Sequence, residues 1–336
     1  MASDLRALQA HELPAHAELV FQSYRAGRDL PAGSMLTYPD WWLRSIGREP
    51  GYRPEQTRVL CRAGRLVASV TCFMRPSRVA GREVPMACIG SVCTHPDWRR
   101  QGLVREVLAE AAEWLRQQGI VAAFLFGLEA VYGGSGWRHL STWSTAARLG
   151  ARPGLADGLR ERPADPSGDL AVLMALHEAF AADLTGPLCR TAAFWTRRVL
   201  GERGPWSPPA VVQLIERDGE PVGYYAGQDG RLDEVAWRSD QASAVLAFLL
   251  QRWPDRPLTL PLFSTDLAAE LRSVAAIAPQ ADCFKSPGTV TLTETYRGLW
   301  RFIADPAGVL PGVHDTESLL ALLRQRDYTY WAADRA

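Results

Sequence analysis

The chain carries no excess of charge of either sign, since its 336 residues include 37 Lys and Arg against 37 Asp and Glu. Without a basic field, no surface is predicted to attract nucleic acid or anionic lipid. No apolar run approaches the ~20 residues that a membrane-spanning helix needs, and the first residues contain acidic side chains in place of a signal-peptide core. We therefore expect a cytoplasmic protein that binds neither nucleic acid nor membranes.

Cysteine is also scarce, and the six cysteines are scattered without any CxxC pair. Structural zinc sites are built on such closely spaced pairs, so we expect no metal and reduced thiols. The chain lacks the GxxxxGK[ST] motif of P-loops and the GxGxxG fingerprint of dinucleotide-binding folds. These two kinds of phosphate-binding site are therefore excluded.

What the sequence does contain is a junction between an apolar strand and a helix in residues 88 to 119. A short basic loop, Arg99 to Val104, leads into a helix whose apolar residues recur with the spacing of one helical face. Gly119 is placed to end this helix, and an apolar strand follows from Ile120 to Phe126. The residues predicted to form the buried face are Val104, Val107, Leu108, Ala111, Ala112 and Leu115.

The basic loop has the chemistry of an anion site. A helix N-terminus presents unpaired backbone N–H groups and a partial positive charge, which together favour a bound phosphate. Gly102 would let a phosphate approach the backbone, and the guanidinium groups of Arg99 and Arg100 suit a pyrophosphate. By itself, such a run could also be an ordinary helix start.

With its lead-in, this loop resembles the acetyl-CoA loop of the GNAT superfamily of N-acetyltransferases, which carries [RQ]xxGx[GA] after a run ending in P-x-x-R. Arg99 and Gly102 fill the first two motif positions, while Val104 departs from the usual Gly or Ala. The resemblance implies that acetyl-CoA is the co-substrate, with its pantetheine arm along the strand and its pyrophosphate in the loop. The implied contacts are Val92, Cys93 and Thr94 in the strand, and Arg99, Arg100, Gln101, Gly102, Leu103 and Val104 in the loop.

A second element, residues 128 to 142, is similar to the Y-x-x-x-G-[FY] element of that family. Tyr132 holds the tyrosine position, and the resemblance implies that it protonates the departing CoA thiolate. A phenol remains a proton donor at neutral pH. A packing role for Tyr132 is the alternative. Glu129 is the nearest candidate for a base that accepts the proton of the amine, with ordered water as the alternative.

The order of elements repeats in the second half of the chain. Residues 59 to 70 and 214 to 225 each consist of two apolar strands around a glycine, Gly64 or Gly219, which predicts two hairpins. A strand, a helix and a strand are then expected at residues 232 to 237, 243 to 251 and 258 to 263. We therefore predict an α/β (α+β) protein of tandem GNAT folds, each a mixed, mostly antiparallel twisted sheet flanked by helices.

Residues 153 to 168 concentrate proline, glycine and charge, so we expect a linker there between units of residues 1 to 152 and 169 to 336. Helices at 170 to 184 and 190 to 200 would open the second unit. In that unit, RSDQAS stands where the first has RRQGLV, and Asp240 would repel a pyrophosphate. The second unit is thus expected to be degenerate, shaping the substrate pocket without binding CoA.

The tandem arrangement is similar to that of the enhanced-intracellular-survival aminoglycoside acetyltransferases, which use a C-terminal carboxylate as base. The resemblance extends this role to the carboxylate of Ala336. Near the end of the chain, a capping signature at Asp315 to Glu317 predicts an amphipathic helix, followed by an aromatic strand from Tyr328 to Trp331. These aromatic residues either pack on the second unit or line the pocket.

The acceptor is the least defined part. Asp40, Trp41 and Trp42 fall in a region that forms one wall of the acceptor site in the family, and they could receive a cationic amine. Alternatively, both tryptophans are packing anchors and Asp40 caps a helix. We expect an enzyme that acetylates a primary amine on a small molecule or peptide by direct attack, and that could be a homo-oligomer. The alternative is a non-catalytic acyl-CoA-binding or protein-interaction module on the same fold.

Overall fold

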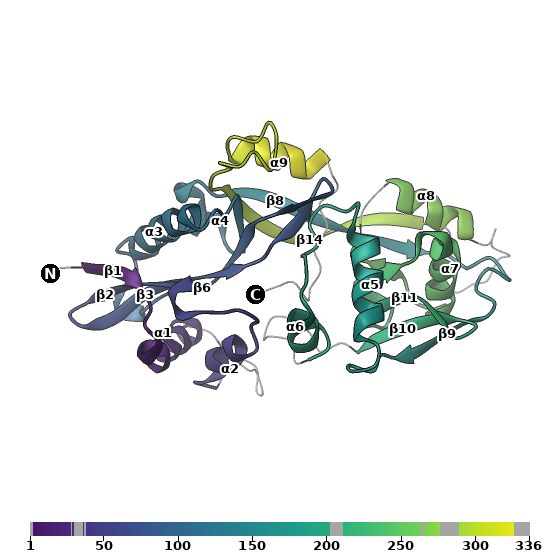
Figure 1. Cartoon of the computed structure of the whole chain (residues 1–336), viewed down its shortest axis with the longest axis horizontal. Coiled ribbons are helices and arrows are strands. Elements are labelled where there is room, and N and C mark those ends of the chain that lie inside the picture. The colour runs from purple at the N-terminus through teal and green to yellow at the C-terminus, as the bar shows by residue number, and fades with distance from the viewer. Residues whose placement is uncertain are drawn as a thin grey trace.

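The computed structural model describes residues 3–325 apart from residues 28, 30–35, 37, 202–210, 263–264 and 276–288. Within these residues, twelve strands form one continuous mixed sheet that runs through the long axis of the molecule (Figure 1). Along this sheet the strands follow in the order β1 (Ser3–Ala7), β2 (Thr57–Arg62), β3 (Arg65–Met74), β6 (Met86–Thr94), β7 (Ala122–Phe126), β14 (Thr289–Phe302), β8 (Arg138–Arg148), β13 (Leu258–Leu260), β12 (Arg231–Trp237), β11 (Glu220–Gln228), β10 (Val212–Arg217) and β9 (Leu159–Pro163).

Two of these neighbouring pairs, β6 with β7 and β12 with β13, are parallel, and the other pairs are antiparallel. The predicted α/β class with a mixed, mostly antiparallel sheet is therefore confirmed. The two predicted hairpins are β2–β3 and β10–β11, which turn at Gly64 and Gly219 with positive φ. Positive φ favours glycine because it has no Cβ.

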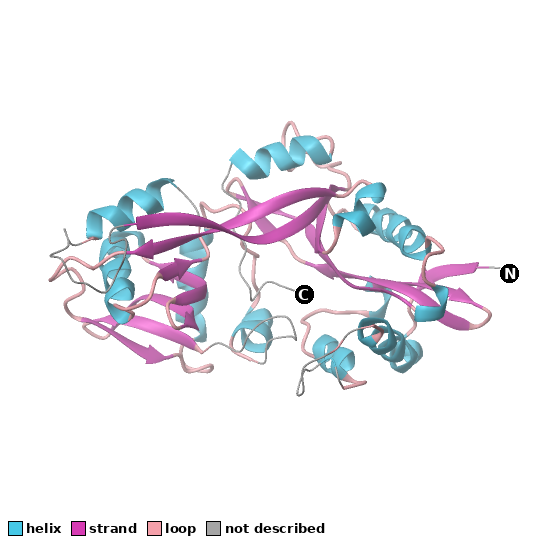
Figure 2. Cartoon of the chain, turned by 180° about the vertical axis from the view of Figure 1, so that it is seen from behind, coloured by secondary structure: helices cyan, strands magenta, loops and turns pink. Residues whose placement is uncertain are grey.

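Helices cover both faces of each half of the sheet, which buries four large apolar clusters (Figure 2). In the first half, α1 (Leu13–Arg25) and α2 (Trp41–Gly47) pack on one face, and α3 (Leu103–Gln117) packs on the other. The face of α3 is as predicted, although Val104 and Ala112 are only half-buried. In the second half, α5 (Leu170–Ala181) and α6 (Ala192–Phe194) face α7 (Ala242–Arg252) and α8 (Thr265–Val274) across the sheet.

The last long strand of each half is inserted into the sheet of the other half. β14 pairs with β8 from Thr289 to Trp300, and its final residues, Gly298–Phe302, pair with β7 on the other side. The end of β8 in turn pairs with β13 of the second half. The two units expected from the sequence therefore share one sheet, and β14 completes the core of the first half through Leu299 and Trp300.

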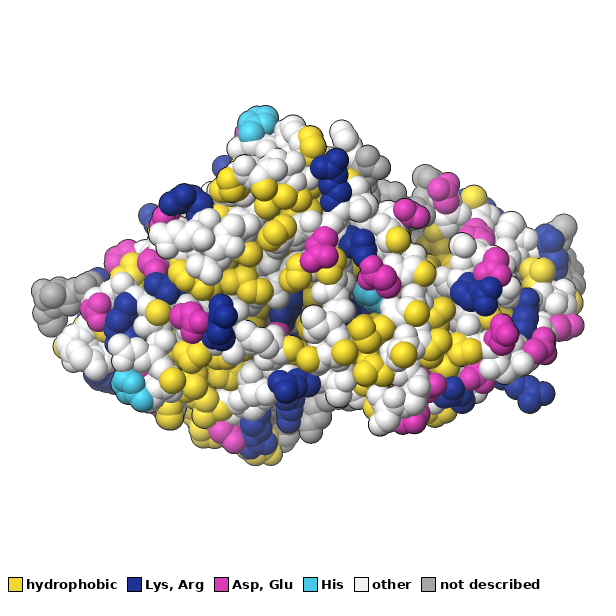
Figure 3. All heavy atoms as spheres, viewed as in Figure 1, with side chains coloured by type: hydrophobic (Ala, Val, Ile, Leu, Met, Phe, Trp, Pro, Cys, Tyr) yellow, Lys and Arg dark blue, Asp and Glu magenta, His cyan; other side chains and the backbone are white. Residues whose placement is uncertain are grey.

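A short hairpin also connects the halves. Strands β4 (Ser77–Val79) and β5 (Arg82–Val84) extend from the first half, and Ser77 forms a backbone bridge with Leu188. Arg78 is paired with Glu178 of α5. Nearby, the carboxylate of Glu49 accepts a hydrogen bond from Arg75 at 2.5 Å and lies 3.8 Å from the guanidinium of Arg198 in the second half. On the face of the molecule shown in Figure 3, acidic and basic side chains are interspersed.

Several predicted segments differ in detail. Residues 153 to 168, expected as a linker, contain β9, which forms the edge of the sheet. The helix expected at 190 to 200 is a single turn, α6, followed by a π-helical turn, Trp195–Val199. The C-terminal helix is α9 (Thr316–Gln325), and Asp315 caps it by accepting a hydrogen bond from the backbone N–H of Ser318. The expected strand from Tyr328 to Trp331 and the carboxylate of Ala336 lie outside the described residues.

Candidate functional site

Strands β6 and β7 diverge halfway along β6. Their parallel pairing covers Met86–Ile89 and Ala122–Leu125 and then stops. Beyond it, β6 contains a bulge, because its register against β3 shifts between the pairs Thr71–Gly90 and Ser69–Cys93. Ser91 in this bulge has a φ of 48°, which is uncommon for a residue with a side chain. The bulge turns β6 away from β7 and opens the sheet.

Buried polar contacts hold the bulge in place from the α1 and α2 side. The indole Nε1 of Trp42 donates a hydrogen bond to Ser91 Oγ at 2.7 Å. Ser69 Oγ on β3 lies 3.1 Å from Cys93 Sγ and 2.7 Å from Nε2 of His16 on α1. Since unpaired polar groups are costly to bury, this network favours one arrangement of the strand.

A cavity of about 670 Å³ occupies the opening between the two strands. Its wall includes residues from both core clusters of the first half. Cys88, Cys93 and Phe126 belong to the α1 and α2 side, whereas Leu103 and Tyr132 belong to the α3 side. The cavity therefore passes through the sheet, from the start of α3 to the face that α1 and α2 cover.

At the α3 side, the cavity meets the basic loop. Arg100 and Gly102 have left-handed φ values of 62° and 76°, so the loop curls directly before α3 begins at Leu103. A Cβ built on Gly102 would meet nothing within 4 Å, which means that glycine is required there by its φ and not by crowding. The first N–H groups of α3 have no intrahelical partner. This end of the cavity can hold an anion.

Three arginine side chains surround this end of the cavity. Arg99, Arg100 and Arg105 line the cavity, and the side chain of Arg99 is held by donating a hydrogen bond to the Ser23 carbonyl at 2.8 Å. Of the residues predicted to bind the cofactor, all but Gln101 line the cavity. The side-chain oxygen of Gln101 instead accepts a hydrogen bond from Arg62 at 3.0 Å.

Tyr132 lines the cavity from α4 (Glu129–Tyr132), and its ring is buried against Gly127. A Cβ on Gly127 would lie 2.3 Å from Cε2 of Tyr132, so only glycine leaves room for the ring. Burial raises the pKa of Tyr132 to about 12, which keeps the phenol protonated at neutral pH. Burial also raises the pKa of Cys93 to about 11, so this thiol is a small core residue and not a resting thiolate.

Glu129 points elsewhere. Its carboxylate is largely exposed and lies 3.5 Å from Nε2 of His139, and Glu129 is not among the residues that line the cavity. Its role as a base stays a prediction.

The predicted acceptor residues do not line the cavity either. Asp40 is exposed, and its carboxylate accepts hydrogen bonds from Arg44 at 2.8 and 2.9 Å. Arg44 lowers the pKa of Asp40 below its usual value. Trp41 and Trp42 are both buried, and Trp42 supports the bulge. This arrangement favours the alternative in which both tryptophans are packing anchors.

Several residues of the cavity wall had no signal in the sequence. Ser23 and Tyr24 come from the last turn of α1, and Phe126 ends β7. Their place in the wall depends on how α1 and β7 pack, which no local pattern encodes. Arg105 did carry a signal, because it is a basic residue that directly follows the loop from Arg99 to Val104.

Residues 5–140, which contain every residue that lines the cavity, match the family model of the acetyltransferase (GNAT) domain. A curated relative from Streptomyces avermitilis, described as an uncharacterized N-acetyltransferase, is 28% identical over 201 residues. The match covers 56% of this chain and 48% of the relative. The chain therefore spans about half the length of that relative.

Solved structures match the fold over both halves. A GCN5-related N-acetyltransferase from Anabaena variabilis has a TM-score of 0.64 at 16% identity, covering 90% of this chain and 73% of that chain. A probable N-acyltransferase from Enterococcus faecalis has a TM-score of 0.66 at 13% identity, covering 92% and 74%. Eis1 from Mycobacterium abscessus has a TM-score of 0.61 at 20% identity, covering 91% and 75%. The fold shared with these proteins extends over the whole tandem arrangement.

Proposed function

We propose that this chain, which belongs to the GNAT N-acetyltransferase family, moves an acetyl group from acetyl-CoA to a primary amine on a small molecule or peptide. The observation that carries the proposal is the opening between β6 and β7, which lies directly beside the left-handed loop at the start of α3. One end of the cavity suits a pyrophosphate, and the other reaches the face where an acceptor could enter.

The residues present fit the cofactor that the family uses. Arg99, Arg100, Arg105 and the backbone around Gly102 would hold the pyrophosphate by charge-assisted hydrogen bonds. The backbone of β6 beyond the bulge is no longer paired with β7, so its groups at Val92–Thr94 are available to a pantetheine arm. When bound, acetyl-CoA supplies an activated thioester.

With an activated thioester bound, the protein would need only to position the amine and to supply a proton to the leaving group. The amine nitrogen would attack the thioester carbonyl carbon in a ternary complex, forming a C–N bond while the C–S bond breaks. Tyr132, which stays protonated because its pKa is about 12, would give its proton to the departing sulfur. Water in the cavity would take the proton of the amine, and no covalent enzyme intermediate is needed.

Calorimetric titration with acetyl-CoA tests the proposal. We expect one binding site per chain, and we expect Gly102→Glu to weaken binding at least about 100-fold by adding charge and a strained φ. Gly119→Glu is the matched control, because Gly119 has the same left-handed φ at the other end of α3, with open space around it. Absence of binding in the unmodified protein would refute the proposal.

A second measurement separates an enzyme from a binding module. With CoA binding intact, Tyr132→Phe should lower the rate of free-thiol release by about 10²-fold or more in an amine screen. An unchanged rate would remove Tyr132 from the mechanism. Binding of acetyl-CoA without turnover of any amine would favour the alternative, a non-catalytic acyl-CoA-binding module.

A further inference from the structure

On the α1 and α2 side, the wall of the cavity includes side chains that the chemistry above does not use. Cys88 is the first residue of β6 to line the cavity, and Phe126 of β7 lines it on the opposite strand. Both side chains belong to the cluster on the α1 and α2 side. In the proposed binding mode, the pyrophosphate lies at the start of α3 and the pantetheine arm lies along Val92–Thr94. An acyl group would therefore extend toward this side of the cavity.

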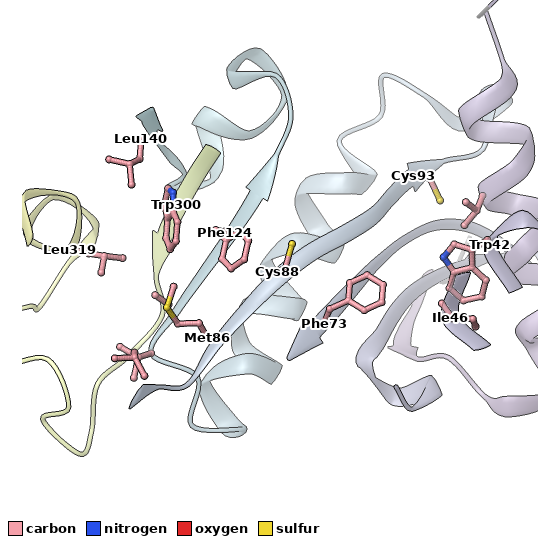
Figure 4. Packing of buried hydrophobic residues seen from close by; sticks show 14 of the residues in the cluster. Trp42, Ile46, Phe73, Met86, Cys88, Cys93, Phe124, Leu140, Trp300 and Leu319 are labelled. Carbon is pink, nitrogen blue, oxygen red and sulfur yellow. The ribbon is translucent and has the colours of Figure 1, made fainter. Parts of the chain in front are cut away.

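Next to Cys88 lies a row of aromatic rings. Cys88 is the register partner of Phe124 on β7, and Phe124 is the register partner of Trp300 on β14. The rings of Phe124 and Trp300 stack with centroids 4.9 Å apart, and Phe126 meets Phe124 edge-on at 6.2 Å. Figure 4 shows Phe124 between Trp300 and Cys88. Since Phe124 is 1% exposed and does not line the cavity, it forms the backing of this wall.

The C-terminal half of the chain supplies the last ring. Gly298 of β14 is opposite Phe126, and a Cβ built on Gly298 would lie 3.2 Å from Nε1 of Trp300. The indole therefore leans over the backbone at Gly298, toward the level of Phe126. Because Gly298 has no side chain, the indole of Trp300 can occupy the space next to Phe126.

We propose that Phe126, backed by Phe124 and Trp300, sets the length of the acyl group that the cavity accepts and restricts the donor to short acyl-CoAs such as acetyl-CoA. The inference rests on the proposed function and adds a selectivity wall to it. Through Trp300, strand β14 of the C-terminal half takes part in choosing the donor, even though the cavity itself is lined by residues of the first half.

The test is a calorimetric series with CoA, acetyl-CoA, butanoyl-CoA and hexanoyl-CoA, which needs no acceptor. For the unmodified protein, we expect affinity to fall at least tenfold from acetyl-CoA to hexanoyl-CoA. Phe126→Ala should bind hexanoyl-CoA at least tenfold more tightly than the unmodified protein, because each methylene that becomes buried is worth about fourfold in affinity. Its affinity for CoA itself should change less than twofold.

Phe73→Ala is the matched control. Phe73 is buried on the same face and is the register partner of Cys88 on β3, but it does not line the cavity. This variant should follow the unmodified protein across the series. Phe126→Leu keeps most of the buried volume and so provides a milder variant, for which we expect a smaller gain in the same direction. Trp300→Leu should also widen the range, which tests the contribution of β14.

The inference is overturned if the Phe126 variants bind CoA but keep the chain-length profile of the unmodified protein. It is equally overturned if the unmodified protein binds hexanoyl-CoA as tightly as acetyl-CoA. If the unmodified protein binds none of the four compounds, the proposed function fails, and this inference fails with it. Binding of CoA therefore distinguishes a wrong wall from a wrong function.

Discussion

The two halves of the molecule can be compared strand by strand. In the first half, His95 directly follows β6 and donates its backbone N–H to the Val67 carbonyl of β3. In the second half, Arg238 directly follows β12 and donates its backbone N–H to the Val222 carbonyl of β11. Both acceptors lie three residues after the hairpin glycine, Gly64 or Gly219. Ser69 and Cys93 thus correspond to Tyr224 and Ala236, which are likewise register partners.

From this shared point the halves differ. In the first half, the register against β6 shifts and Ser91 forms the bulge. In the second half, the pairing continues through Tyr225–Val235 and Ala226–Glu234, and the register shifts only beyond these pairs, between Ala226 and Gly227. Counted from the shared point, Glu234 stands where Ser91 stands in the first half. The irregularity of the first half therefore lies at Ser91, whereas β12 is still regularly paired with β11 at the matching residue, Glu234.

The second half has a buried ion pair at this position. Glu234 is fully buried and accepts two hydrogen bonds from Arg190, at 2.7 and 3.0 Å, and one from the hydroxyl of Tyr224 at 2.7 Å. Burial alone would raise the pKa of Glu234, but Arg190, His177 and Tyr224 together lower it below its usual value. A buried ion pair thus stands at the strand position where the first half has its bulge, so the two halves differ in the strand as well as in the loop.

The starts of the two corresponding helices differ in the same sense. Asp240 precedes α7, and its carboxylate accepts hydrogen bonds from Arg238 at 3.2 Å. Neither residue has the positive φ that curls the loop at Arg100 and Gly102. An acidic side chain at a helix N-terminus already provides the negative charge that a phosphate would bring. The start of α7 therefore already has a carboxylate of its own nearby, where the start of α3 has arginines and a glycine.

Breaking the buried ion pair of the second half should have the largest effect. Glu234→Ala leaves the guanidinium of Arg190 buried without this carboxylate, and we expect the free energy of unfolding to fall by about 3–5 kcal/mol in denaturant titrations. Asp40→Ala is the control, since it removes an ion pair to Arg44 that is exposed and should leave stability unchanged within error. Equal, small effects of the two variants would show that the buried pair does not stabilise the fold.

A shared feature gives the next prediction. Each half buries a histidine edge-on against a tryptophan, His16 against Trp42 and His177 against Trp195. Burial, helped in His177 by the charge of Arg190, lowers the pKa of both histidines from 6.5 to about 3. Because the unfolded chain takes up these protons first, stability is complete above pH 6.5 and is lost as the pH falls from there toward 3.

The expected loss is about 1.4 kcal/mol per pH unit for each histidine within that window, measured as the free energy of unfolding between pH 7 and 5. His16→Gln and His177→Gln should each reduce the pH dependence of the free energy of unfolding by about 1.4 kcal/mol per pH unit. If the slope of both variants equals that of the unmodified protein, these histidines are not the groups that titrate.

The bulge itself can be tested at Ser91. Ser91→Val places a β-branched residue at a φ of 48°, a strain of about 1–3 kcal/mol, and should favour the regular pairing seen in the second half. We expect acetyl-CoA affinity to fall about tenfold in calorimetry. Ser91→Gly tolerates the same φ and should keep the affinity within a few fold, although it loses the hydrogen bond from Trp42. An unchanged affinity in Ser91→Val would mean that the opening does not depend on the bulge.

How far the sequence predicted these differences depends on the distance over which each feature is encoded. The loop from Arg99 to Val104 was predictable because its glycine, its arginines and the start of the helix are neighbours in the chain. Asp240 was predictable in the same way. Ser91 was not, because the bulge depends on partners such as Trp42 that are distant in sequence, and serine carries no signal for a positive φ.

The insertion of β14 and β8 into the sheet of the opposite half could not be predicted from the sequence, for a related reason. No strand was predicted around Leu299 and Trp300, and the neighbours of a strand in a sheet are chosen by the packing of both faces and not by local pattern. The insertion of β14 between β7 and β8 therefore had no signature, and the wall behind Phe126 had none either. For the same reason, the tryptophans at 41 and 42 were open to two interpretations until their burial was known.

The smallest expected effect concerns the second half, and it separates the contribution of the loop from that of the strand. Asp240→Gly removes the acidic side chain before α7 and supplies a glycine, so it imitates one property of the first loop. We expect calorimetry to give one acetyl-CoA per chain both for this variant and for the unmodified protein, because Glu234 and Arg190 still fill the core and β12 has no bulge at the matching position. Two molecules per chain in the unmodified protein would contradict the assignment of a degenerate second half. A second site that appeared only in Asp240→Gly would mean that the loop alone closes that half, and that the paired strand is no barrier to CoA.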